Sequence, residues 1–261
     1  MKKYYEPDKV KKAVPLEPIP EEVRVQYLRP GELLHIMDKF PVAYQPIGTL
    51  EWHGRQNPLG CDALKAEALC IEAAKMAGGA VMPPLYFGTD STRDIGHGLG
   101  CGMDAAAGFQ LPGSFYKMPT RLLKDFYRAA LGNYLDRGFE LVIIVSGHNA
   151  MAQQYLFDEL CYEMMTTDGR ERVCFTMEYA VLEENDPRRH SDHAGFYETS
   201  MMMYLTDRVN PRANDNCEAP ELAISTTRPL KEASPSEGEE YFKLQAEGLA
   251  RFAKMKMAPQ S

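Results

Sequence analysis

The stretch LVIIVSGHN, residues 141–149, decides the fold that we expect of this chain. Its first five residues are apolar and mostly β-branched, which is typical of a strand that is buried on both faces of a parallel sheet. Gly147 lets the backbone turn where the strand ends, so that His148 follows at the carboxyl edge of the sheet. Open α/β sheets bind their ligands at this edge. The stretch therefore predicts both a central strand and the place of a functional site.

Similar strand signals alternate with helical patterns along the rest of the chain. We expect strands at residues 42–47, 80–82 and 173–177, and helices at residues 30–40, 62–77, 120–136, 150–165, 195–205 and from residue 234 onward. This alternation indicates an α/β fold with a mostly parallel central sheet. Residues 1–25 are rich in Pro, Lys and Glu and are expected to form an N-terminal arm, which leaves residues 26–261 as a single domain.

The composition argues against several classes of protein. The 261 residues carry 29 Lys and Arg against 37 Asp and Glu, and the resulting net charge of −8 argues against nucleic-acid binding. No apolar run is long enough to span a bilayer, so we expect no membrane partner. The first residues lack the apolar segment of a secretory signal, and the six cysteines form no C-x-x-C pair. We therefore expect a cytoplasmic protein with reduced thiols.

Metal-binding side chains follow the strand expected at residues 42–47. Glu51 and His53 come soon after it and would point the same way along an extended chain, and Asp62 can fold back after a turn at residues 58–60. Glu, His and Asp are ligands of divalent metal ions. The alternative is an ordinary polar surface loop, and spacing alone leaves the two interpretations about equal.

Two further segments carry candidate functional residues. His148 is either a metal ligand or a structural histidine at the end of its strand. His193 and Glu198, close to Asp192, form a candidate acid–base and metal-binding set. Their spacing differs from the H-E-x-x-H motif of zincins. A helix start capped by Asp192 or Ser191 is the structural alternative, and it is compatible with the functional one.

Loop residues could select the substrate. Residues 88–113 hold seven glycines and no clear period, which indicates a long functional or mobile loop. The candidate substrate-binding residues lie in this loop and in the one after Glu51; they are Arg55, Gln56, Arg93 and His97. The two arginines favour an anionic or strongly polar substrate.

Three motifs together resemble the creatininase (creatinine amidohydrolase) family. The first is PIGTLEWHG, residues 46–54, followed by PLGCD, residues 58–62. The second is SGHN, residues 146–149, which is similar to the N-G-H segment of the family. The third is HAGFYETS, residues 193–200, which is similar to its H-A-G-x-x-E-T-S segment. Three motifs in the right order are far more specific than any one of them.

The resemblance implies a three-layer α/β/α fold, a homo-oligomer that is commonly a hexamer, and two divalent metal ions as cofactors. The ions are usually zinc or manganese and sometimes iron. The implied ligands are Glu51 and His148 for one ion, His53 for the other, and Asp62 as a bridge between them. The resemblance further implies that His193 is catalytic and that Glu198 is a metal ligand or a catalytic acid.

The chain departs from the family pattern at two positions. Creatininase itself has a metal-binding Glu where this chain has Ala150, so a carboxylate must come from elsewhere, and Glu198 is our candidate. Gln56 stands where the family has a histidine. The motifs therefore support a metal site, but they do not identify the substrate.

The resemblance predicts a dinuclear metal-dependent hydrolase that opens a small cyclic amide, similar to creatinine, or a related C–N bond. Its partner would be a small polar cyclic substrate. The alternative on the same metal site is a ring-opening C–C hydrolase of a cyclic ketone or β-diketone. The alternative of another class is a non-catalytic metal-binding protein.

Overall fold

The computed structural model describes residues 5–115, 118–165, 169–190 and 192–258. Its central sheet contains the four strands β1 (Val42–Ile47), β2 (Ala80–Val81), β5 (Leu141–Ser146) and β6 (Val173–Met177). They lie in the order β2-β1-β5-β6, and every pair is parallel. Residues 141–146 therefore form a central strand, as their apolar run predicts.

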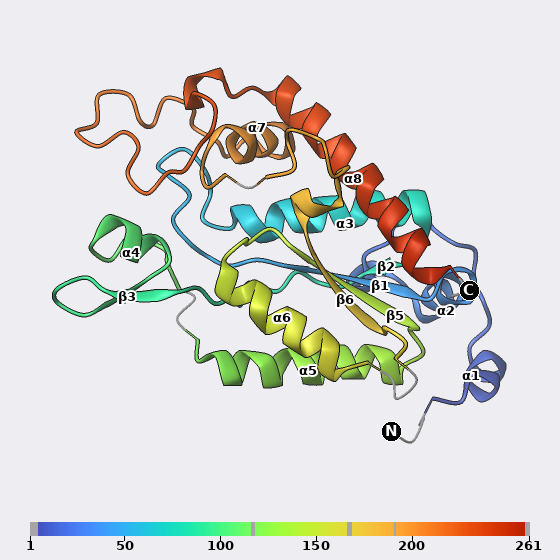
Figure 1. Cartoon of the computed structure of the whole chain (residues 1–261). Coiled ribbons are helices and arrows are strands. Elements are labelled where there is room, and N and C mark those ends of the chain that lie inside the picture. The colour runs from blue at the N-terminus through green and yellow to red at the C-terminus, as the bar shows by residue number, and fades with distance from the viewer. Residues whose placement is uncertain (1–4, 116–117, 166–168, 191, 259–261) are drawn as a thin grey trace.

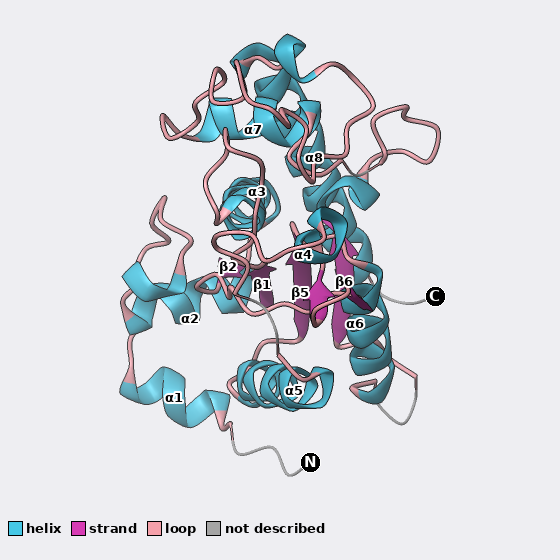
Figure 2. Ribbon diagram, turned by 90° about the vertical axis from the view of Figure 1, so that its left-hand side faces the viewer, coloured by secondary structure: helices cyan, strands magenta, loops and turns pink. Residues whose placement is uncertain are grey.

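Helices cover both faces of this sheet (Figure 1; Figure 2). One layer contains α3 (Cys61–Ala77), α7 (Phe196–Leu205) and α8 (Pro235–Met257), and the other contains α5 (Thr120–Asp136) and α6 (Met151–Glu163). Side chains alternate in direction along a strand, so that Tyr44 and Ile143 pack in the first layer while Ala43 and Ile144 pack in the second. The expected three-layer α/β/α fold is confirmed.

Shorter elements lie around these layers. Near the N-terminus are α1 (Pro7–Ala13), the 3-10 turn η1 (Val25–Tyr27) and α2 (Pro30–Lys39). Two further 3-10 turns, η2 (Glu178–Val181) and η3 (Leu230–Glu232), follow β6 and precede α8. Val81 of β2 donates its backbone N–H to the carbonyl of Val23 at 2.8 Å, so the N-terminal segment reaches the edge of the sheet. The division into an arm and a single domain stays a prediction.

The glycine-rich segment is more regular than its sequence suggests. Residues 88–113 contain the antiparallel hairpin of β3 (Thr92–Asp94) and β4 (Leu99–Cys101), followed by the short helix α4 (Met103–Ala107). This hairpin projects away from the sheet (Figure 1). Within the described ranges, no helix is both long and apolar enough to cross a membrane.

Candidate metal centre

The candidate site lies at the carboxyl edge of the sheet, where β1 and β5 end side by side. Glu51 and His53 follow β1, His148 follows β5, and Asp62 lies in the first turn of α3. All four side chains are buried. Parallel neighbouring strands end at the same edge, which is why segments far apart in sequence converge here.

Two glycines allow α3 to begin between the strand ends. A Cβ atom at Gly147 would lie 2.7 Å from the carbonyl carbon of Asp62 and 2.9 Å from its Cα. A Cβ atom at Gly48 would lie 2.5 Å from the Cβ of Asp62. Both separations are too short for real atoms, so only glycine permits this approach. The glycines thereby bring the Asp62 carboxylate between the residues from β1 and β5.

Glu51, Asp62 and His148 form a first group of possible metal ligands. Each offers one ligand atom, and these atoms all lie within 4.8 Å of one another. Nδ1 of His148 lies 2.8 Å from Oε1 of Glu51 and 3.3 Å from Oδ2 of Asp62. The second oxygen of Glu51, Oε2, is buried and has no hydrogen-bond partner among the residues that the structure describes. A buried oxygen without a partner is costly, and a bound cation would satisfy it.

His53 lies on the other side of the Asp62 carboxylate. Its Nε2 lies 2.8 Å from Oδ1 of Asp62, 3.7 Å from Oε2 of Glu198 and 4.0 Å from Oε1 of Glu51. The opposite ring nitrogen, Nδ1, lies 3.2 Å from the carbonyl of Glu51, which holds the ring in place. Asp62 thus contacts one histidine with each of its carboxylate oxygens.

The electrostatics of this cluster favour positive charge. Burial alone would lower the pKa of His53, but the carboxylates of Asp62 and Glu198 outweigh it and raise this pKa to about 9. Burial likewise opposes the charge of His148, and Glu51 and Asp62 reverse the effect, so its pKa lies well above the usual value. Protons on the two histidines offset part of the negative charge of the acidic residues. Bound metal cations would do the same.

Glu198 lies beside this cluster and is fixed by two donors. Its Oε2 accepts the backbone N–H of Ala194 at 2.7 Å, and its Oε1 accepts a hydrogen bond from the ammonium group of Lys65. Lys65 also donates to Oε1 of Glu178 at 2.8 Å, and its side chain is fully buried. Burial opposes the charge of Lys65, but Glu178 and Glu198 outweigh it and keep its pKa well above the usual value. The arrangement leaves Oε2 of Glu198 facing His53.

Sequence reasoning missed Lys65 and Glu178. Lys65 lies three residues after Asp62, on the same face of α3, and Glu178 directly follows β6. The 3.6-residue period of the helix could have placed Lys65 near Asp62. A lysine within a helix is more often exposed, however, and nothing in the sequence indicates its two acidic partners.

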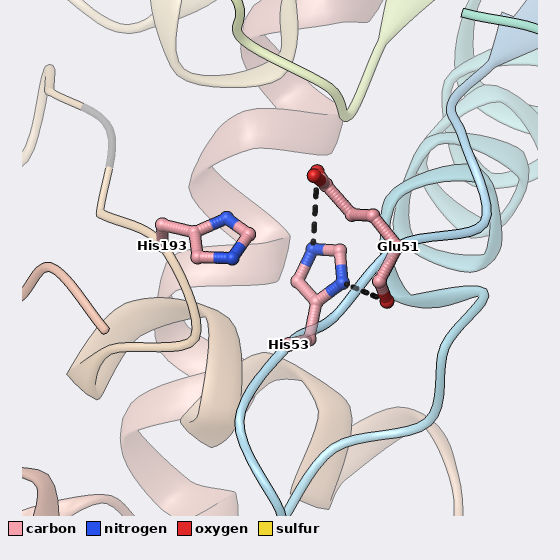
Figure 3. Close-up of side chains that lie close together, drawn as sticks. All are labelled: Glu51, His53 and His193. Carbon is pink, nitrogen blue, oxygen red and sulfur yellow. Dashed lines mark hydrogen bonds and ion pairs between the residues drawn. The ribbon is translucent and has the colours of Figure 1, made fainter. Parts of the chain in front are cut away.

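His193 approaches the cluster from a separate segment. Its backbone forms a pair of hydrogen bonds with Ser225, at 2.8 and 2.9 Å. Its Nε2–H donates to the carbonyl of Trp52 at 2.7 Å, which leaves Nδ1 free of a proton in the neutral ring. The rings of His53 and His193 lie 4.6 Å apart, and Glu51 reaches toward them (Figure 3). The half-buried His193 ring is therefore held in a fixed orientation beside His53.

The start of α7 fixes this region further. Oδ2 of Asp192 accepts the backbone N–H of Tyr197 at 2.7 Å, and Oδ1 accepts that of Glu198 at 3.2 Å. Asp192 thus satisfies two backbone donors in the first turn of the helix, as a capping residue does. The other cap candidate, Ser191, lies outside the described residues.

The four candidate substrate-binding residues lie in different surroundings. Gln56 is buried; its Nε2 donates to the carbonyl of Ala194 at 2.7 Å, and its Oε1 accepts from the side chain of Asn214 at 2.7 Å. Arg55 donates to the carbonyl of Ala219 at 2.8 Å. The remaining two belong to the hairpin, where the Arg93 guanidinium binds the carbonyl of Ala105 and the exposed His97 lies between the strands. The structure does not gather these four side chains into one group.

A known protein family matches this chain. The family model "Creatininase: Creatinine amidohydrolase" matches residues 27–253. The chain belongs to the creatininase family. A metal-dependent hydrolase is the activity class that follows from this membership, and the ligand groups around Asp62 agree with it. The family resemblance that we based on three motifs is confirmed.

Solved creatininase structures have the same fold as this chain. A creatinine amidohydrolase (creatininase) matches with a TM-score of 0.72 and 20% identity, over 92% of this chain and 100% of the other. A mutant creatininase described as Zn-Zn type matches with a TM-score of 0.70 and 20% identity, over 91% of this chain and 99% of the other. A structure described as creatininase Mn matches with a TM-score of 0.69 and 21% identity, over 91% and 100%. Comparison with curated protein sequences found no match.

Proposed function

We propose that this chain is a dinuclear metal hydrolase that opens a small cyclic amide by addition of water. The observation that carries the proposal is the position of Asp62, whose carboxylate lies between His53 and His148. A second observation supports it, because a buried oxygen of Glu51 lacks a partner beside the same group. Histidine and carboxylate sets of this kind bind zinc, manganese or iron.

The ligands divide into two groups around Asp62. Glu51, Asp62 and His148 would hold the first ion. His53 and Asp62 would hold the second, with Oε2 of Glu198 supplying the carboxylate that is missing at Ala150. Zinc and manganese are the metals named for the similar creatininases, and either fits these oxygen and nitrogen ligands.

The residues of this chain then have distinct tasks in the reaction. When bound, two divalent ions would supply Lewis-acid chemistry, because metal ions lower the pKa of water and polarise a carbonyl oxygen. Glu51, His53, Asp62 and His148 keep this chemistry in a buried site, where electrostatic stabilisation is strongest. His193 moves the proton to the leaving nitrogen through Nδ1, because its Nε2 is committed to the carbonyl of Trp52. Glu198 and the backbone pairing with Ser225 keep the segment that carries His193 in position.

Ring opening of defined substrates tests this function. Metal-free protein is reloaded with zinc or manganese and incubated with a panel of cyclic amides and cyclic ketones, and the products are identified by mass spectrometry and amine detection. We expect the metal-loaded protein to add water to a cyclic amide and release an amine. Activity on cyclic ketones alone, or equal inactivity of the parent and its Asp62→Asn variant on every ring, would contradict the proposal.

We also propose that the chain works as a homo-oligomer. Large apolar side chains are exposed on the hairpin, the loop after α4 and α6; they include Leu99, Phe115, Tyr155 and Tyr162. Exposed apolar residues of this size are common where copies of a protein pack together. Light scattering after size-exclusion chromatography would test the assembly, and a monomer at micromolar concentration would contradict it.

A further inference from the structure

Cys61 is the first residue of α3 and directly precedes Asp62. Its side chain is fully buried. The thiol sulfur, a ring nitrogen of His53 and a carboxylate oxygen of Glu198 all lie within 4.8 Å of one another. Ligand atoms around one tetrahedral metal ion are separated by about 3–4 Å, given bonds of about 2.0–2.3 Å. These three side chains are therefore close enough to share an ion after small adjustments.

Of the three side chains of Cys61, His53 and Glu198, only the thiol makes no hydrogen bond to the described residues. Glu198 already accepts hydrogen bonds from Lys65 and from the backbone of Ala194. His53 is held by Asp62 and by the carbonyl of Glu51. The sulfur of Cys61, by contrast, has no hydrogen-bond partner in the described part of the chain. It is a free electron donor beside two residues that we place at the second metal ion.

We propose that Cys61 is a ligand of the second metal ion, the one held by His53 and Glu198, so that this ion has a sulfur ligand that the carboxylates alone do not provide. The inference rests on the proposed dinuclear site and extends it. On binding, the S–H bond loses its proton to solvent and the thiolate donates its electron pair to the ion. Thiolate ligands favour zinc and disfavour manganese. The second position is therefore selective for zinc, while the first, with only oxygen and nitrogen ligands, accepts either metal.

Cobalt substitution tests this ligand without an activity assay. Metal-free protein is titrated with Co²⁺, and absorption is recorded in the near ultraviolet, where thiolate-to-cobalt charge transfer gives a band. The parent is compared with Cys61→Ala and with Cys70→Ala as the matched control. Cys70 lies on the same helix, is equally buried and belongs to none of the metal-ligand groups found in the described residues. Competition between zinc and manganese is measured on the same three proteins.

We expect a charge-transfer band in the parent and in Cys70→Ala, and its loss in Cys61→Ala. Zinc preference at the second position should fall at least about tenfold in Cys61→Ala, as expected when a metal site loses a supporting group. If the parent binds cobalt but shows no charge-transfer band, Cys61 is not a ligand, and the proposed hydrolase is unaffected. This result needs only the parent protein, so it holds even if the variants fail to fold. A band that persists in Cys61→Ala would also overturn it. A parent that binds no cobalt would overturn both proposals.

Discussion

Replacing Gly147 with alanine tests how closely the fold controls the metal centre. The new Cβ atom would lie 2.7 Å from the carbonyl carbon of Asp62, whereas ordinary contact begins at 3.4 Å. The carbonyl oxygen of Asp62 would lie closer still, so the end of β5 and the start of α3 must separate by more than the difference 3.4 − 2.7, about 0.7 Å. Metal–ligand distances tolerate only about 0.2 Å, so the displacement moves Asp62 or His148 out of range. Crowding of this kind also costs about 1–3 kcal/mol of stability.

Isothermal titration with zinc and urea unfolding measure the two effects of Gly147→Ala. We expect at least one ion to bind more than about tenfold more weakly, and the free energy of unfolding to fall by about 1–3 kcal/mol. Gly132→Ala is the matched control, because no atom lies within 4 Å of its added Cβ and the residue is in the middle of α5. The control should gain roughly 0.5–1 kcal/mol from helix propensity. Parent-like zinc binding in Gly147→Ala would refute the reasoning.

The remaining predictions concern single site residues. His148→Ala removes a ligand of the first ion and should lower metal content, measured by plasma emission; equal content in the parent and the variant would remove His148 from the ligand set. His193→Ala should keep its metal and lose about 10²–10⁴-fold in turnover on a ring substrate, and an active variant would contradict its role in proton transfer. Glu198→Gln should lose one ion of the pair, so that retention of both would show that Glu198 does not replace the missing carboxylate. The pKa of His53 is raised from 6.5 to about 9. The protonated ring therefore stabilises the metal-free protein fully below pH 6.5, and this stabilisation is lost as the pH rises through about 9. Urea unfolding of metal-free protein across this range checks the sign, and a contribution of His53 that grows with pH would contradict it.

The sequence predicts the central strand and the position of the site because the apolar run of residues 141–145 and the parallel order of the strands point to the same arrangement. The apolar run at residues 141–145 forms a strand only when buried on both faces, and that burial requires helical layers. Once β1 and β5 are parallel neighbours, the residues that follow them must meet at one edge. The convergence of Glu51, His53 and His148 is thus a consequence of chain direction.

Other features depend on partners that no local pattern reveals. Residues 88–113 form a hairpin through backbone pairing of Thr92 with Cys101, and backbone pairing leaves little trace in a glycine-rich sequence. Gln56 is a polar loop residue by sequence, yet its amide joins Ala194 to Asn214 in the interior. The fixing of Glu198 by Lys65 likewise depends on tertiary contacts between α3 and α7.

Anomalous diffraction from crystals of the zinc-loaded protein tests the central claim most directly. We predict two peaks, one within bonding distance of Glu51, Asp62 and His148 and the other beside His53 and Asp62. Peaks located elsewhere, or no peak in contact with the Asp62 carboxylate, would contradict the account.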